Sequence, residues 1–152
     1  MHLSKELPEA SVRAIVDFME QKVPFNRLLQ VKIIDLHKGF CRVKIPWNPD
    51  LLGDPDRKAV HGGVLASILD VAGGTAAMTE LEHKQRLSTL NLRVDYLKPG
   101  PPENLICDAF VVHKGNKVCH VSMKLFPEGK EESIALGQAI YSVARPKVNV
   151  SE

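Results

Sequence analysis

The sequence has few cysteines, little net charge and no long apolar run. Its three cysteines, Cys41, Cys107 and Cys119, lack the spacing of metal ligands and are expected to be free thiols in a reducing cytoplasm. A formal net charge of +2, with no basic run longer than two residues, argues against a nucleic-acid partner. Charges or glycines break each apolar run well short of a membrane span, and the first residues lack the pattern of a secretory signal.

The length and composition are those of an ordinary globular protein. The chain has 152 residues, of which 44% are hydrophobic and 25% are charged. No repeat, linker or low-complexity segment divides it, so residues 1–152 are expected to form a single domain.

Hydrophobic periodicity predicts the order α-β-β-α-β-β-β-β. Residues 9–23 have the apolar spacing of an amphipathic helix, and a short helical turn is expected at 25–29. A long polar loop is expected at 46–60 and an apolar helix at about 62–81. The strands are expected at 31–36, 40–45, 89–96, 105–113, 117–126 and 134–143. Short links between the later strands favour an antiparallel sheet of five to six strands that covers the central helix, an α+β fold with an additional N-terminal helix.

The central helix carries one carboxylate, Asp70, in its apolar middle. An ionised carboxylate that is removed from water is costly unless it is paired or hydrogen-bonded, which makes Asp70 a candidate catalytic residue. Its neighbours at helical spacing are all small: Gly63, Ala66, Ser67, Gly73, Gly74 and Ala77. Because glycines inside a helix are unfavourable, we expect another helix or a ligand to approach the backbone on this side.

The start of the same helix is a candidate anion-binding site. After His61, the residues Gly62 and Gly63 leave unpaired amides at the positive end of the helix, where they could stabilise charge that develops on a carbonyl oxygen. Gly62 and Asp70 are eight residues apart, about 12 Å along one helix. One helix therefore cannot bring both groups to one reacting atom, but two antiparallel helices in a dimer could.

Two segments carry a family resemblance. Residues 60–64 (VHGGV), with Asp70 on the same helix, and residues 90–100 (LNLRVDYLKPG) resemble the hotdog-fold acyl-CoA thioesterases, specifically the PaaI-like branch of the 4-hydroxybenzoyl-CoA thioesterase superfamily. The resemblance covers roughly residues 28–145. It implies a sheet wrapped around the helix, hydrolysis of an acyl-CoA without cofactor or metal, and a homodimer or homotetramer.

The resemblance also implies roles for individual residues. Asp70 would be the base or the nucleophile, and the Gly62 amide would bind the oxyanion. His61 would help to shape the carbonyl site, Gly63 would bind the substrate, and Ser88, or Thr89 beside it, would hold the attacking water. Many relatives have an asparagine in the loop before the glycine pair, where this chain has Asp54. Candidates to bind the phosphates of coenzyme A are Arg93, Lys98 and Lys117, with Lys114, Arg145 and Lys147 in addition.

Two other functions are compatible with these residues. A hotdog hydratase or dehydratase would use His61 and Asp70 as an acid–base pair on carbon, although the Pro-Gly sequence typical of those dehydratases is absent beside His61. A non-catalytic acyl-CoA sensor would normally be fused to a DNA-binding segment. The N-terminal thirty residues are too short for one, and Asp70 argues for catalysis.

Overall fold

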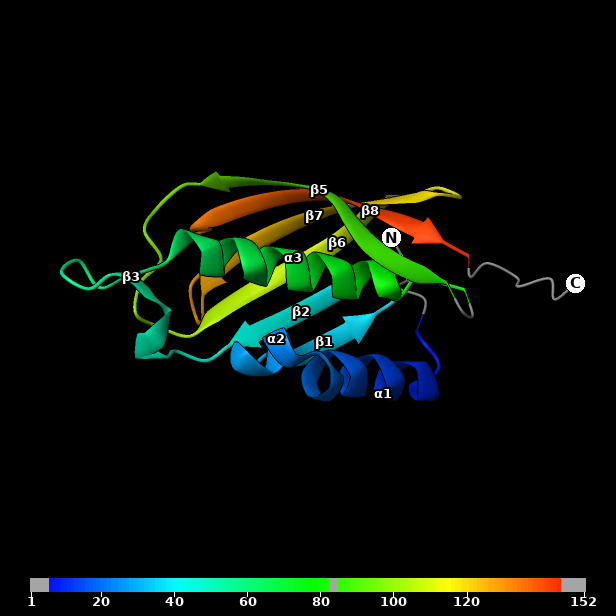
Figure 1. Cartoon of the computed structure of the whole chain (residues 1–152), viewed down its shortest axis with the longest axis horizontal. Coiled ribbons are helices and arrows are strands. Elements are labelled where there is room, and N and C mark those ends of the chain that lie inside the picture. Colours follow the sequence, from blue (N-terminus) through cyan, green and yellow to red (C-terminus); the bar gives the residue numbers. More distant parts are fainter. Residues whose placement is uncertain (1–5, 83–84, 146–152) are drawn as a thin grey trace, which may run out of the picture.

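A central helix crosses one face of an antiparallel sheet (Figure 1). The computed structural model describes residues 6–82 and 85–145. Its helical elements are α1 (Glu9–Asp17), the π-helix η1 (Phe18–Lys22), α2 (Pro24–Leu28), the 3₁₀-helix η2 (Pro49–Leu51) and α3 (Gly62–Met78). Among the described residues, none of the helices combines the length and the apolar character needed to cross a bilayer.

The sheet has six strands in the order β1-β2-β6-β7-β8-β5, all antiparallel to their neighbours. The bounds are β1 (Lys32–His37), β2 (Phe40–Ile45), β5 (Arg86–Tyr96), β6 (Leu105–Lys114), β7 (Val118–Pro127) and β8 (Ala135–Ala144). The predicted order of elements and all six strands are confirmed. Strand β5, which follows α3, lies at an edge of the sheet.

Several predicted segments differ from the structure: residues 18–22 of the first predicted helix form the π-helix η1, and β5 begins at Arg86 rather than near 89. The segment 46–60 is not only a loop, because it also forms η2 and a two-stranded ribbon of β3 (Leu52–Asp54) and β4 (Ala59–Val60). Helix α3 ends at Met78 rather than near 81, and the Thr79 hydroxyl accepts a hydrogen bond from the Gly39 amide at 2.8 Å. This contact ties the end of the helix to the hairpin between β1 and β2.

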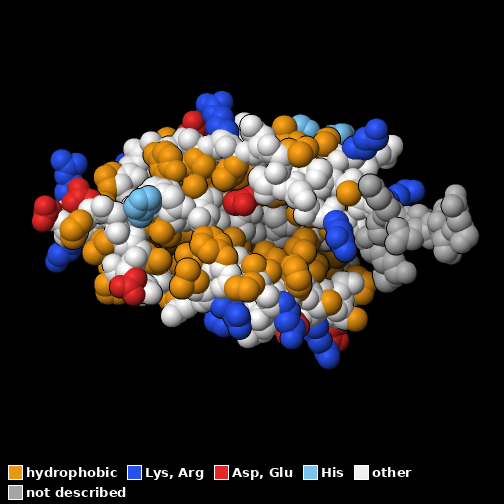
Figure 2. Space-filling model, in the orientation of Figure 1, with side chains coloured by type: hydrophobic (Ala, Val, Ile, Leu, Met, Phe, Trp, Pro, Cys, Tyr) orange, Lys and Arg blue, Asp and Glu red, His pale blue; other side chains and the backbone are white. Residues whose placement is uncertain are grey.

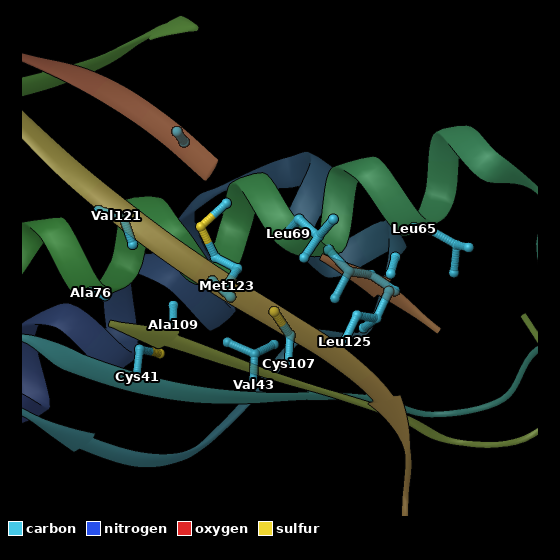
Figure 3. Packing of buried hydrophobic residues seen from close by; sticks show 14 of the residues in the cluster. Cys41, Val43, Leu65, Leu69, Ala76, Cys107, Ala109, Val121, Met123 and Leu125 are labelled. Atoms are coloured by element: carbon cyan, nitrogen blue, oxygen red, sulfur yellow. The ribbon is translucent and has the colours of Figure 1, made fainter. Parts of the chain in front are cut away.

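One side of α3 is packed closely against the sheet (Figure 3). Ile68 and Leu69 are fully buried there, and Ala72 and Ala76 allow the helix to lie near the strands. The sheet contributes Cys41, Val43, Cys107, Ala109, Val121, Met123 and Leu125 to the same cluster. Each fully buried aliphatic side chain stabilises the fold by about 1.5–3 kcal/mol. This packing fixes the helix on the sheet.

The other side of α3 faces the N-terminal segment, defined here as α1, η1 and α2 (Figure 1). Within this segment the buried Asn26 side chain donates to the Met19 carbonyl at 3.0 Å, and Glu20 ties the segment to β1 by accepting from the Ile33 amide at 2.8 Å. Helix α1 itself has no buried residue. The N-terminal segment is therefore held at a few points and leaves space beside α3.

Candidate active site

Two hydroxyl groups hold one oxygen of Asp70. The Thr89 hydroxyl donates to Asp70 Oδ1 at 3.0 Å, and the Tyr141 hydroxyl donates to the same oxygen at 3.2 Å and to the Asp70 carbonyl at 3.0 Å. Within residues 6–82 and 85–145, Oδ2 has no hydrogen-bond partner. The carboxylate is thus oriented through one oxygen and available through the other.

Asp70 is half-buried in the single chain, so the expectation of a carboxylate removed from water is wrong for this state. The reason is a cavity of about 380 Å³ between α3 and the N-terminal segment. Its lining consists of Met19, Val23, Phe25, Asn26, Ser67, Asp70, Val71, Gly74, Met78, Leu87, Ser88, Thr89 and Tyr141. Figure 2 shows a band of apolar side chains along this face, with an acidic side chain above it. An apolar cavity of this size with a few polar groups is typical of a small-molecule site.

Tyr141, on β8, was not singled out from the sequence. Burial, together with the nearby charge of Asp70, raises the pKa of its phenol, so the hydroxyl stays protonated and acts as a donor. Gly73 makes room for it, because a Cβ on Gly73 would lie 2.4 Å from the Tyr141 hydroxyl oxygen. The group that approaches Gly73 is therefore this tyrosine, whereas its neighbour Gly74 faces the cavity.

A β-bulge in β5 decides which hydroxyl meets Asp70. Thr89 pairs with Tyr141 and Asn91 with Ile140, which leaves Leu90 as an extra residue. In a regular strand Thr89 and Asn91 would share a face, and Ser88 would point toward the helix instead. The bulge reverses this alternation, so Thr89 contacts Asp70, while Ser88 lies beside it at the cavity and pairs with Ser142.

The start of α3 provides one free amide. His61 is the N-cap, and its Nδ1 accepts from the Gly63 amide at 2.8 Å. The Tyr96 hydroxyl donates to the Gly62 carbonyl at 2.9 Å, but within the described residues the Gly62 N–H has no acceptor. Of the two predicted donors, Gly62 is therefore the one that is available. Because Nδ1 of His61 accepts, a neutral His61 ring carries its proton on Nε2.

A second cavity, of about 360 Å³, lies at this end of α3. It is lined by His61 and Gly63, and it shares Phe25 and Ser67 with the cavity at Asp70. The segment 46–60 reaches it with Asn48, Asp50 and Leu51, and the Asn48 side-chain oxygen accepts from the Asp50 amide at 3.0 Å. Sequence reasoning missed Asn48, although Asn-Pro is a strong turn signal.

Asp54, the loop residue expected at the site, is used within its own turn. Its Oδ1 accepts from the amides of Asp56 and Arg57 at 3.1 and 3.0 Å. In the part of the chain that the structure describes, neither of the two cavities beside α3 has Asp54 in its lining.

Comparison with known proteins shows the family to which this site belongs. A family model described as the thioesterase superfamily matches residues 58–134. The chain is also 32% identical over 148 residues to the medium/long-chain acyl-CoA thioesterase YigI of Escherichia coli (strain K12), with 89% of this chain and 95% of the relative covered. This chain belongs to the thioesterase superfamily. It is a thioester hydrolase, as its sequence predicts.

Solved structures confirm the hotdog fold. A thioesterase family protein from Silicibacter pomeroyi superposes with a TM-score of 0.82 at 23% identity, covering 90% of this chain and 99% of that one. The PaaI protein of E. coli, from its phenylacetic acid degradation operon, gives a TM-score of 0.79 at 20% identity and covers 89% and 94% of the two chains.

In this member of the thioesterase superfamily, the candidate cations are not gathered at Asp70. Arg93 pairs with Asp95 at 3.2 Å and is in register with Gln138, on the sheet face away from α3. Lys98 pairs with Glu132, beyond the end of β5. Lys114 ends β6, and Lys117 is exposed beside the turn between β6 and β7. Arg145 follows β8, and Lys147 lies outside the described residues.

Metal-ligating residues do not cluster in the described chain. Among residues 6–82 and 85–145, no group of three or more His, Cys, Asp or Glu side chains could hold a metal ion. All three cysteines are free and buried.

Proposed function

We propose that this protein hydrolyses the thioester of an acyl-coenzyme A to a free acid and coenzyme A. One observation carries the proposal: Asp70 has one oxygen held by Thr89 and Tyr141, and its second oxygen, which has no partner among the described residues, lies beside an apolar cavity. A base for water and a space for an acyl group thus lie together. Membership of the superfamily supports the reaction, and the name of the E. coli relative supports an acyl-CoA with a medium or long chain.

The proposed active site combines residues of two chains. Gly62 and Asp70 lie about 12 Å apart along α3, too far for both to act on one carbonyl. Strand β5 is an edge strand, and Leu90, Tyr96 and Leu97, on it or next to it, are more than half exposed. An antiparallel second copy beside β5 would cover these side chains and bring its own α3 start to Asp70. Two equivalent sites would then form in a homodimer, and a homotetramer would be a pair of such dimers.

Hydrolysis would proceed by attack of water on the thioester carbonyl carbon. Asp70 Oδ2 takes a proton from the water while the new C–O bond forms, and the Gly62 N–H of the other protomer donates to the carbonyl oxygen as it becomes negative. The positive end of α3 adds to this stabilisation. When the tetrahedral intermediate collapses, the C–S bond breaks and the coenzyme A thiolate leaves. Asp70 then passes its proton to that thiolate.

Direct attack by Oδ2 is the other route that the residues allow, and it would give a mixed anhydride. A single turnover in ¹⁸O-labelled water identifies the anhydride route where water cleaves the anhydride at the Asp70 carbonyl. In our mechanism the label enters the free acid during the first turnover. Label on Asp70 would instead identify this residue as the nucleophile.

The first experiment measures release of free thiol from a panel of acyl-CoAs. We expect turnover with at least one medium or long chain. Clear binding without turnover would favour the acyl-CoA sensor and overturn the proposal. Addition of water to an enoyl-CoA without thiol release would instead identify a hydratase.

The composite site is tested by mixing two variants whose activity is strongly reduced. Asp70→Asn removes the base, and Gly62→Pro removes the amide proton at a helix position that accepts proline. In a mixed dimer, one site would contain both defects and the other site neither. Random pairing should therefore restore about a quarter of the wild-type activity. A site formed within a single chain would show no such gain in any mixture.

We also propose a cytoplasmic location, which is supported by the three buried free thiols. Cell fractionation with antibody detection tests it. Recovery of the protein in the membrane or extracellular fraction would contradict this location.

A further inference from the structure

A third cavity, of about 620 Å³, lies between α1 and the end of α3. Its lining consists of Leu7, Pro8, Ser11, Ala14, Ile15, Phe18, Met78, Thr79, Leu81, Glu82 and Gln85. We call this space the distal chamber. It is larger than either cavity described above, and nothing in the proposed chemistry at Asp70 requires it.

The distal chamber adjoins the cavity that contains Asp70. Within the described residues, Met78 lines both spaces and is the one residue that they share. Met78 lies eight residues after Asp70, about 12 Å farther along α3. The two spaces are thus consecutive along one helix, and a flexible, half-buried methionine stands between them.

The apolar part of the distal chamber suits an aliphatic chain. Leu7, Ile15, Phe18 and Leu81 supply apolar surface, and Phe18 remains 45% exposed. Two of the polar lining residues already have partners: the Thr79 hydroxyl donates to the Ala76 carbonyl, and the Gln85 side chain accepts from the Glu82 amide. Helix α1 therefore presents apolar side chains to a space that no part of the described chain fills.

We propose that the distal chamber receives the end of a long acyl chain and that Met78 separates long from medium substrates. This inference rests on the proposed acyl-CoA hydrolysis. An extended chain advances about 3.5 Å for every three bonds, so a chain that starts at Asp70 reaches Met78 after roughly ten bonds. Shorter chains end before Met78, and longer chains pass it and lie against α1.

Three variants and one matched control test the proposal with octanoyl-, dodecanoyl- and hexadecanoyl-CoA. Met78→Trp narrows the connection between the Asp70 cavity and the distal chamber, and Met78→Ala widens it. Ala14→Trp fills the distal chamber from α1 and leaves the sequence of α3 unchanged. Arg13→Ala, an exposed change next to Ala14 that removes only an ion pair with Glu9, is the control. The readout is the ratio of kcat/KM for the longest chain to that for the shortest chain.

We expect Met78→Trp to lower this ratio by about tenfold or more and Met78→Ala to raise it. Ala14→Trp should penalise hexadecanoyl-CoA more than dodecanoyl-CoA, because only the longer chain extends well past Met78. Arg13→Ala should leave the ratio as in the wild type. Thermal unfolding of each variant identifies any that fails to fold, and the remaining variants still decide the question.

Two kinds of failure can be separated. If the wild type hydrolyses none of the three substrates, the proposed function fails. If it hydrolyses them but Met78→Trp, Met78→Ala and Ala14→Trp all keep the wild-type ratio, the proposed function stands and the role of the distal chamber is refuted.

Discussion

The two sides of α3 differ in how closely they are packed. Toward the sheet, Ile68, Leu69 and Ala72 are fully buried in one continuous cluster. Toward the N-terminal segment, the same helix borders three cavities of about 360, 380 and 620 Å³. One helix thus serves as a core element on one side and as the wall of a groove on the other.

This difference shows where a change should affect stability and where it should affect catalysis. A side chain packed against the strands can change only at a cost in folding, because the interior has no spare volume. A side chain on the groove side can change the reaction while the fold persists. Asp70 lies on the groove side and is held by groups from β5 and β8.

The largest effect is expected for Asp70→Asn. This change removes the proposed base and should lower kcat by about 10³-fold, within the usual range for a general base. Steady-state thiol release measures it, and thermal unfolding should show a melting temperature close to that of the wild type. Asp17→Asn, which removes an exposed charge at the end of α1, is the matched control. Activity near that of the wild type in Asp70→Asn would refute the mechanism.

Gly62→Pro should have the next largest effect. His61 has φ −58° and ψ 132°, a conformation that proline favours in the residue before it, so the helix start is compatible with the change. Loss of the Gly62 N–H should lower kcat by about 10²-fold. Gly62→Ala keeps the N–H and should retain far more activity. Equal losses in both variants would mean that the amide proton is not the important group.

Gly73→Ala should destabilise the protein by about 2 kcal/mol, because the new methyl group would displace the buried Tyr141 hydroxyl. The expected fall in melting temperature is about 5 °C. Differential scanning calorimetry measures it. An unchanged melting temperature would show that Tyr141 can move aside without cost.

Gly74→Ala should have a smaller effect on stability than Gly73→Ala, and one of the opposite sign. A Cβ at this position would lie 3.6 Å from the Tyr141 ring, an ordinary contact, and alanine favours the helix by about 1 kcal/mol. Because Gly74 lines the cavity at Asp70, kcat/KM should fall while the melting temperature rises. A loss of stability as large as that of Gly73→Ala would contradict the distinction between the two sides.

Much of the fold follows from local patterns. The six strands and α3 have clear apolar periodicity, and the start of α3 carries its own signals in His61, Gly62 and Gly63. Asp70 stands out in the sequence because it is a charge among apolar residues. These features depend on neighbours within a few positions, and the sequence displays such neighbours directly.

The rest depends on contacts between distant segments. Tyr141 lies 71 residues from Asp70 along the chain, and nothing near Tyr141 in the sequence indicates their hydrogen bond. The distal chamber forms only because α1 lies beside the end of α3. Asn48 reaches the second cavity through a loop whose conformation, with η2 and the β3–β4 ribbon, has no periodic pattern.

The bulge at Leu90 has a consequence for tracing the ancestry of this active site. In this chain the hydroxyl residue that faces Asp70, Thr89, stands two positions before Asn91, because Leu90 is an extra residue between them. In a relative without the extra residue, the equivalent hydroxyl residue would directly precede the counterpart of Asn91. An alignment without a gap there would match Thr89 with a residue on the opposite face. An insertion or deletion of one residue, rather than a substitution, would then account for an apparent loss of the group that holds Asp70.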